Sequence, residues 1–289
     1  MVSSDWAFRI AILAILVVLV QNMRIIRTNR RLRQLADEAN NARRQAEATE
    51  QRNRQLKQEM TSNIAHELKT PLSAISGYLE ILLSDKPIDE AQRHHFLQRC
   101  YSQTQRLGEL VRDVSLINKL EESADLFPRT DIDASTIANE AFAELSEFAQ
   151  KRGISLENHL PSPLPLTGNS QLLYAIFRNL TENAIFYAGD GVKVVVETYE
   201  PQTLTPSNAT LSTHYFIHFY DTGTGVTDEF LSRLFDRFAR NDSGRSRQQG
   251  GTGLGLSIVK HAVLFHGGDI YAKNRPEGGL EFFFSLKKQ

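Results

Sequence analysis

The apolar positions near the start of the chain form one continuous run. Residues 10–20 are all apolar, and a helix from Trp6 to Ile26 would reach about 30 Å, the thickness of a bilayer core. Five arginines and no acid follow within residues 24–33. The positive-inside rule therefore predicts a membrane anchor over residues 1–26 with the rest of the chain in the cytoplasm. A helix lying in the membrane interface and a signal-like segment are the alternatives.

A second pattern follows, in which apolar or small residues recur at alternating spacings of three and four, as in a heptad seam. A polar residue at a core position, here Asn53, can fix the register of a parallel dimer. We expect a coiled-coil signalling helix over residues 27–59, and a single solvated amphipathic helix is the alternative. The seam comprises Leu32, Leu35, Ala39, Ala42, Ala46, Thr49, Asn53, Leu56 and Met60.

Two amphipathic stripes occupy residues 60–122, and residues 84–87 interrupt them. Asp89, with Gln92 three residues later, is the expected N-cap of the second helix. The two helices predict a hairpin whose own core is thin. Two hairpins are therefore expected to dimerise into a four-helix bundle.

Helical and strand patterns mix without strict β-α-β alternation over residues 130–289, which is typical of an α+β layer. A proline-rich loop is expected at residues 161–165 and another loop at residues 239–253. The pattern predicts helices over residues 137–148, 170–187 and 254–265, and strands over residues 154–158, 191–197 and 215–220 and near residues 270 and 282.

The net charge and the cysteine count limit which partners and which cysteine-based sites are expected. The formal net charge of -1 gives no reason to expect a direct nucleic-acid partner. The single cysteine, Cys100, excludes an internal disulfide and a cysteine-based metal cluster.

His66 is singled out by its helical phase. It lies two residues from both Ile64 and Leu68, so it points about 200° away from the apolar stripe and should face solvent. Thr70 follows one turn later on the same face. Taken alone, an exposed helical histidine is most often an ordinary surface residue.

Two neighbours make His66 a candidate nucleophile. Pro71 has no N–H to donate to the carbonyl of Glu67, which predicts a loosened helix at this point. A neutral imidazole is a good nucleophile near neutral pH, and the Glu67 carboxylate is placed to hold or deprotonate it.

Two segments of the C-terminal part suit a nucleotide. Asn179 and Asn183 stand one helical turn apart, so their amide oxygens suit a hard cation that bridges phosphates. Asp221 follows a strand and can accept a hydrogen bond from an adenine amino group, while Gly223 and Gly225 permit close approach of the backbone. A polar helix face and an ordinary strand-to-turn sequence are the simpler interpretations of each segment alone.

Two later segments suit phosphate. Leu234-Phe-Asp-Arg237-Phe238 combines aromatic anchors with a cation. The glycine-rich residues 250–255 precede a helix, whose free N–H groups and dipole suit anions. A dinucleotide-binding fold would carry such a motif after its first strand, so the position near the C-terminus disfavours that interpretation.

The string Ser62-Asn-Ile-Ala-His66-Glu67-Leu-Lys-Thr70-Pro71-Leu-Ser closely resembles the H-box of two-component sensor histidine kinases. The four later segments resemble, in the family's order, its N-box, G1 box, F-box and G2 box. The resemblance runs from about residue 60 to the C-terminus. It implies a helical hairpin forming a dimeric four-helix bundle, followed by an α+β sandwich of the Bergerat type shared with Hsp90-like and gyrase-like ATPases over residues 130–289.

The resemblance also implies roles for single residues. His66 would be phosphorylated, Glu67 would be its acid/base helper, and Thr70 would support dephosphorylation of the response regulator. Asn183 would hold Mg²⁺. The implied nucleotide-binding residues are Asn179, Asn183, Tyr187, Asp221, Gly223, Gly225, Arg237, Gly251, Thr252, Gly253, Leu254 and Gly255.

The expected protein is a homodimeric, ATP- and Mg²⁺-dependent histidine kinase of the bacterial inner membrane. It would transfer phosphate from His66 to an aspartate of a response regulator receiver domain, and it would also dephosphorylate that regulator. A regulator-binding phosphatase or scaffold with feeble kinase activity is one alternative. An ATP-dependent clamp like the other ATPases of the superfamily is another.

One position departs from the family pattern. Relatives commonly carry a basic residue three positions after the second N-box asparagine, and here Phe186 takes that place while Tyr187 is kept. Losing one charge-assisted contact costs roughly 1.5–3 kcal/mol. We therefore expect weaker nucleotide binding than in close relatives unless Arg237, Arg245 or Arg247 compensates.

Overall fold

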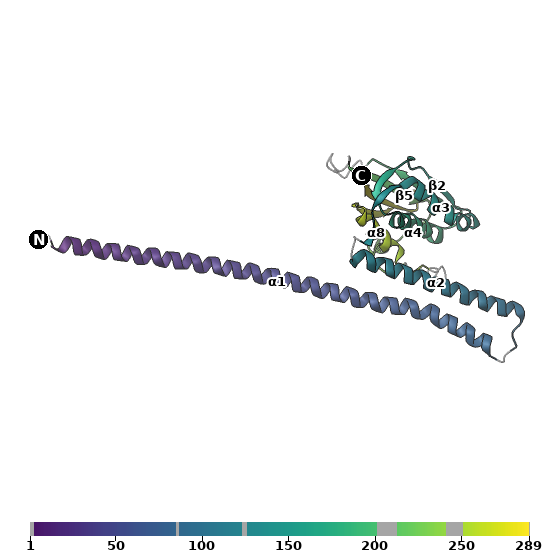
Figure 1. Cartoon of the computed structure of the whole chain (residues 1–289), viewed down its shortest axis with the longest axis horizontal. Helices are drawn as coiled ribbons and strands as arrows, with labels where there is room; N and C mark the ends of the chain where they lie inside the picture. The colour runs from purple at the N-terminus through teal and green to yellow at the C-terminus, as the bar shows by residue number, and fades with distance from the viewer. Residues whose placement is uncertain (1–2, 85–86, 123–125, 201–212, 241–250, 289) are drawn as a thin grey trace. The chain divides into compact units, whose positions relative to one another are not determined.

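The computed structural model describes residues 3–84, 87–122, 126–200, 213–240 and 251–288, although many side chains before residue 58 are outside the description. It divides into two compact units, residues 1–62 and 63–289. Helix α1 (Ser3–Leu83) runs through the first unit without a break and supplies the first helix of the second (Figure 1).

The N-terminal predictions fall largely outside the described side chains. The apolar run of residues 10–20 belongs to α1, but its side chains are not among those described. The same holds for most of the heptad seam, including Asn53. Among the described residues, no helix combines the length and the apolar character needed to cross a membrane.

The second unit begins with a helical hairpin. The end of α1 and helix α2 (Glu90–Glu122) flank the predicted break. The predicted cap is confirmed, because the Gln92 N–H donates to Asp89 Oδ1 at 2.7 Å and the Asp89 N–H donates to Gln92 Oε1 at 3.4 Å. This reciprocal pair satisfies backbone donors that the first turn of α2 would leave without partners.

Helix α1 continues through Pro71, so the expected loosening does not appear as a break. Thr70 Oγ1 donates to the carbonyl of His66 at 3.3 Å, which adds a local bond one turn before the proline. The helical bonds on either side hold the segment even though proline removes one donor.

The hairpin buries only part of its apolar stripes. Ile117 and Leu110 of α2 are buried, but Leu79 of α1 remains 42% exposed and Leu72 57% exposed in the single chain. This is the thin core that the sequence predicts for a hairpin without its partner.

The rest of the second unit is an α/β sandwich. A five-stranded sheet has the order β2-β4-β5-β7-β6, in which only the β2–β4 pair is parallel. The short antiparallel pair β1–β3 lies apart from it. The strands are β1 (Thr130–Asp133), β2 (Ser155–Asn158), β3 (Pro165–Gly168), β4 (Lys193–Thr198), β5 (His214–Asp221), β6 (Ile270–Asn274) and β7 (Leu280–Lys287).

Three helices cover one face of the sheet: α3 (Ala134–Lys151), α4 (Ser170–Tyr187) and α8 (Gly255–Phe265) (Figure 1). Strand side chains alternate between faces, so Ile217 and Phe219 of β5 are buried in the common core with α4 and α8. Burying this apolar surface is the main force that holds helices and sheet together.

Most predicted elements are confirmed, and α4 has the expected bounds. Strand β1 was not predicted, and β3 begins at Pro165, where a loop was expected to end. Both strands have only four residues, so neither offers a clear period of two, and their pairing is decided by the fold. The short helix α6 (Asp228–Leu231) lies after β5, with Thr227 as its N-cap.

Candidate nucleotide and phospho-acceptor site

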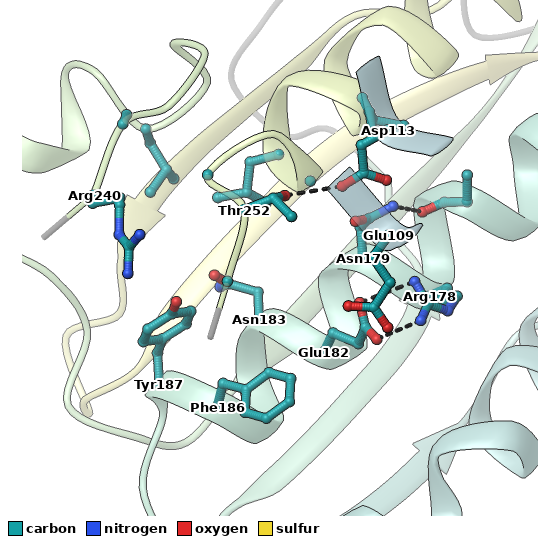
Figure 2. Close-up of a pocket in the computed structure, with 18 of the residues that line it drawn as sticks. Glu109, Asp113, Arg178, Asn179, Glu182, Asn183, Phe186, Tyr187, Arg240 and Thr252 are labelled. Carbon is teal, nitrogen blue, oxygen red and sulfur yellow. Dashed lines mark hydrogen bonds and ion pairs between the residues drawn. The ribbon is translucent and has the colours of Figure 1, made fainter. Parts of the chain in front are cut away.

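A cavity of about 1170 Å³ opens over α4 and is lined by the loop after β5, by residues 251–253 and 255–256, and by part of α2 (Figure 2). It brings together segments that are far apart in the sequence. The predicted site residues on its wall are Asn179, Asn183, Tyr187, Asp221, Gly225, Gly251, Thr252, Gly253 and Gly255.

Helix α4 presents both asparagines to this cavity. Asn179 Nδ2 donates to the Ala175 carbonyl at 2.7 Å, which orients its Oδ1 towards the start of α8. A Cβ on Gly255 would lie 2.5 Å from that oxygen, so only glycine allows α8 to begin this close to Asn179. Asn183 is half-buried one turn further along.

Asp221 ends β5 and is buried at the cavity wall. Burial raises the pKa of its carboxyl, while the N–H groups of Gly223 and Leu280 donate to it and partly oppose that rise. The bond from Gly223 is 2.8 Å long. A Cβ on Gly223 would lie 2.2 Å from the Ala188 carbonyl oxygen, which explains the glycine beside the aspartate.

The glycine-rich segment is fastened to the segment after α6. Gly253 has a φ of 71°, and its carbonyl accepts a 2.8 Å hydrogen bond from the Phe238 N–H. Phe238 itself has a φ of 60°, an uncommon conformation for a bulky residue that stores backbone strain. The F-box and the G2 box therefore form one joined structure beside the start of α8.

Three of the predicted nucleotide-binding residues do not line the cavity: Gly223, Arg237 and Leu254. Leu254 is buried beneath the loop. Near the F-box, Arg240 lines the cavity, three residues after the expected Arg237 (Figure 2). The two other arginines considered as compensation, Arg245 and Arg247, lie outside the described residues.

An acidic cluster that the sequence analysis missed lines the cavity beside the asparagines. Arg178 pairs with Glu182 at 2.7 Å and with Glu144 at 3.3 Å. Burial raises the pKa of Glu182 to about 7; Arg178 opposes this shift, and the nearby carboxylates Glu109, Asp113 and Glu144 add to it. Only the fold brings these acids together, because they come from α2, α3 and α4.

Asp113 of α2 reaches the glycine-rich segment directly. The Thr252 hydroxyl donates to Asp113 Oδ2 at 2.9 Å (Figure 2). The same hydroxyl accepts a 3.2 Å bond from the Leu254 N–H. Burial raises the pKa of Asp113, and the Thr252 hydrogen bond and the Arg178 charge oppose that rise.

The predicted phospho-acceptor residues lie on the hairpin, outside the cavity lining. His66 and Thr70 are exposed, as the helical phase predicted. Glu67 Oε2 lies 3.6 Å from Arg106 Nη2 of α2 and 3.4 Å from Arg240 Nη1. In this arrangement the predicted helper of His66 is held by two arginines.

Two families match the chain over these two structural parts. Residues 56–123 match the His Kinase A (phospho-acceptor) domain, and residues 168–289 match the family described as histidine kinase-, DNA gyrase B- and HSP90-like ATPase. The chain therefore belongs to the two-component sensor histidine kinases, and the hairpin and ATP-binding sandwich expected from the sequence are confirmed.

Individual sensor histidine kinases are similar to the chain in sequence. Over 230 residues the chain is 33% identical to the sensor-like histidine kinase SenX3 of Mycobacterium tuberculosis, covering 80% of this chain and 53% of that protein. It is 34% identical over 232 residues to the phosphate regulon sensor protein PhoR of Pseudomonas aeruginosa, covering 79% and 49%. The chain thus spans about half the length of the curated relatives it matches.

Solved structures share the fold. The histidine kinase AdeS of Acinetobacter baumannii superposes with a TM-score of 0.57 at 20% identity, covering 78% of this chain and 98% of that one. The histidine kinase ThkA, solved in complex with the response regulator protein TrrA, superposes with a TM-score of 0.59 at 21% identity, covering 80% and 61%.

Proposed function

We propose that the protein is an ATP-dependent protein-histidine kinase that phosphorylates its own His66 and passes the phosphoryl group to an aspartate of a response regulator. The observation that carries this proposal is the cavity that joins the α4 asparagines, buried Asp221 and the glycine-rich segment in a chain that also presents an exposed His66. Membership of the sensor histidine kinases supports the same reaction.

The residues present fit Mg-ATP. Asp221, a buried acceptor, would bind the adenine amino group. The amide oxygens of Asn179 and Asn183 line the cavity and suit a hard cation, and Asn183 would hold Mg²⁺. The start of α8 supplies N–H groups for phosphate. Bound Mg²⁺ would neutralise phosphate charge during the transfer.

His66 would attack the γ-phosphorus of ATP through a neutral ring nitrogen, and the bond from that phosphorus to the β,γ-bridging oxygen would break and release ADP. Glu67 would hold the imidazole and take its proton. Glu67 does so only after its ion pairs with Arg106 and Arg240 are rearranged. The helical phase of His66 leaves its ring open to a donor approaching from outside the hairpin.

We further propose a membrane-anchored homodimer that also dephosphorylates its regulator. Two hairpins over residues 60–122 would form the dimer, and residues 27–59 would connect them to a membrane anchor over residues 1–26 in the bacterial inner membrane. The ATP-binding domain would occupy residues 130–289 in the cytoplasm. Thr70, exposed one turn after His66, would support dephosphorylation of the regulator.

Labelling tests the reaction. Incubating the full chain with γ-labelled ATP and Mg²⁺ should give an acid-labile, base-stable label that is lost in His66→Gln. His95→Gln, which changes an exposed histidine on α2, should keep the label. Label that survives in His66→Gln would contradict the proposal.

A regulator-binding phosphatase with feeble kinase activity is the second candidate, and the observation that favours it is apolar Phe186 on the cavity wall (Figure 2). Under that function, the wild-type chain would gain almost no label but would remove phosphate from a phosphorylated receiver domain. Thr70→Ala should then abolish that removal.

A further inference from the structure

The contact between Asp113 and the glycine-rich segment leads to an inference that rests on the proposed ATP site. We propose that Asp113 of α2 competes with the nucleotide phosphates for Thr252, so that ATP binding and docking of α2 on the glycine-rich segment oppose each other. Asp113 is then a positioning residue: it reports the presence of nucleotide to the hairpin that carries His66.

The Thr252 hydroxyl can donate only one hydrogen bond at a time. A hydroxyl has one hydrogen, and that of Thr252 is donated to Asp113 Oδ2 at 2.9 Å. The lone pairs of Thr252 Oγ1 accept the Leu254 N–H at 3.2 Å. Thr252 therefore donates to Asp113 or to a phosphate oxygen, but not to both.

Thr252 lies close to the helix start that is expected to attract phosphate. Thr252 lies three residues before the first residue of α8, where helix N–H groups and the helix dipole favour an anion. Asp113 and Thr252 line the same cavity as Asn179 and Asn183. A carboxylate of the protein's own hairpin therefore stands where the helix start would otherwise attract phosphate (Figure 2).

The negative charge of Asp113 would also repel a bound phosphate. The cavity beside Asp113 is lined by acidic Glu109 and Glu182 and by basic Arg112 and Arg178, and Arg178 pairs with Glu182 at 2.7 Å. Bringing phosphate next to the Asp113 carboxylate is unfavourable, because like charges in a partly buried site are screened little by solvent. Nucleotide binding is therefore favoured when α2 moves and Asp113 leaves Thr252.

The hairpin makes a second contact of the same kind. Glu67, next to His66, lies 3.4 Å from Arg240, one of the arginines that line the cavity. A bound phosphate that attracts Arg240 would weaken the ion pair between Arg240 and Glu67. Both contacts link nucleotide occupancy to the state of the hairpin, and by thermodynamic linkage a movement of α2 alters nucleotide affinity by the same factor.

The test uses the full chain and a non-hydrolysable ATP analogue, adenosine β,γ-imidotriphosphate with Mg²⁺, titrated calorimetrically. Asp113→Ala should tighten binding about fivefold, the size of one competing hydrogen bond. Glu109→Ala is the matched control, since Glu109 lies one turn earlier on α2 and lines the same cavity, and no hydrogen bond joins it to Thr252 among the described residues. It should change affinity less than about twofold.

A double-mutant cycle separates the hydrogen bond from general charge. Thr252→Val removes the shared donor, so Asp113→Ala should give no gain in that background. An equal gain with and without the Thr252 hydroxyl would overturn the competition, and so would an equal gain from Glu109→Ala. Thermal unfolding of each variant establishes that it is folded.

Hydrogen exchange gives a readout independent of affinity. Adding the analogue to the wild-type chain should speed amide exchange in residues 110–117 of α2, because the contact with Thr252 is lost; slower or unchanged exchange there would overturn the proposal. Absence of any binding by the wild-type chain would contradict the ATP site itself, whereas wild-type binding that Asp113→Ala leaves unchanged would overturn only the competition.

Discussion

At the scale of single residues, the site depends on side chains whose environment sets their chemistry. Asp221 is a buried carboxylate held by backbone N–H groups, and Asn179 is oriented by its own helix. Phe186 is the exception, because it brings an apolar ring to the wall of a cavity that suits phosphate.

Replacing Phe186 tests whether this ring weakens nucleotide binding. Phe186→Lys should tighten binding of Mg²⁺ and the non-hydrolysable ATP analogue by about tenfold or more, because it adds a charge-assisted contact. Phe186→Leu keeps the site apolar and should bring no such gain. Titration calorimetry measures the affinity of the wild type and both variants for the analogue. Equal affinities for Phe186→Lys and the wild type would show the prediction to be wrong.

His266 predicts an acid-sensitive step in stability. Its Nε2 accepts the Asn169 N–H at 3.1 Å and its Nδ1 donates to the Ala262 carbonyl at 2.7 Å, so the buried ring is held neutral. Burial is the main cause of its lowered pKa. The unfolded chain then binds a proton that the folded chain resists, and the stabilisation is complete above about pH 6.5 and is lost as the pH falls.

Between pH 7.5 and pH 5.5 this residue should lower the free energy of unfolding by up to about 1.4 kcal/mol. Urea unfolding at both pH values measures the difference. The pH-dependent part should disappear in His266→Gln and persist in His94→Gln, which changes an exposed histidine. The same pH dependence in His266→Gln as in the wild type would assign it to other groups.

At the scale of elements, end contacts decide where helices begin. Asp133 is the N-cap of α3: its Oδ1 accepts the Ser135 N–H at 3.1 Å and the Leu164 N–H at 2.8 Å, and its Oδ2 accepts the Thr136 hydroxyl at 2.6 Å. It thereby ties the start of a helix to the segment that leads into β3.

Removing this cap should be costly. Asp133→Ala should lower the free energy of unfolding by about 1–2 kcal/mol, because it leaves N–H donors of α3 and of Leu164 without an acceptor. Asp133→Asn keeps an acceptor oxygen and should lose less. Chemical denaturation of the two variants gives the comparison, and losses of equal size would argue against the capping role.

At the scale of the whole molecule, the hairpin is incomplete by itself. Apolar residues of its stripes, such as Leu72 and Leu79, stay exposed in the single chain, while the ATP-binding sandwich has a continuous buried core. A second hairpin placed against these residues would remove apolar surface from water, which is the expected origin of the dimer that we propose.

Leu79→Glu should therefore weaken the dimer, raising its dissociation constant about tenfold or more because a charge would be buried without a partner. Ser73→Glu changes an exposed polar residue of the same helix and should leave the dimer intact. Analytical ultracentrifugation of both variants over a range of concentrations measures this. A dimer unaffected by Leu79→Glu would place the contact surface elsewhere.

Local rules of helix and turn formation made several parts of this protein readable from the sequence. Hydrophobic periodicity located the hairpin helices and α4, the Asp89–Gln92 pair located the start of α2, and the helical phase of His66 predicted its exposure. The glycine and asparagine motifs identified part of the cavity wall, because the backbone and cation chemistry they serve restricts the residue types that fit.

The residues that face those motifs across the cavity are brought there by the packing of distant elements. Asp113 on α2 and Arg240 after the F-box meet the site through packing, and no local spacing relates Asp113 to Thr252, 139 residues away. The strands β1 and β3 likewise exist because each supplies the other's hydrogen bonds. Contacts between distant segments depend on how whole elements pack, so the sequence named the nucleotide motifs but not the acidic residue that we propose competes for them.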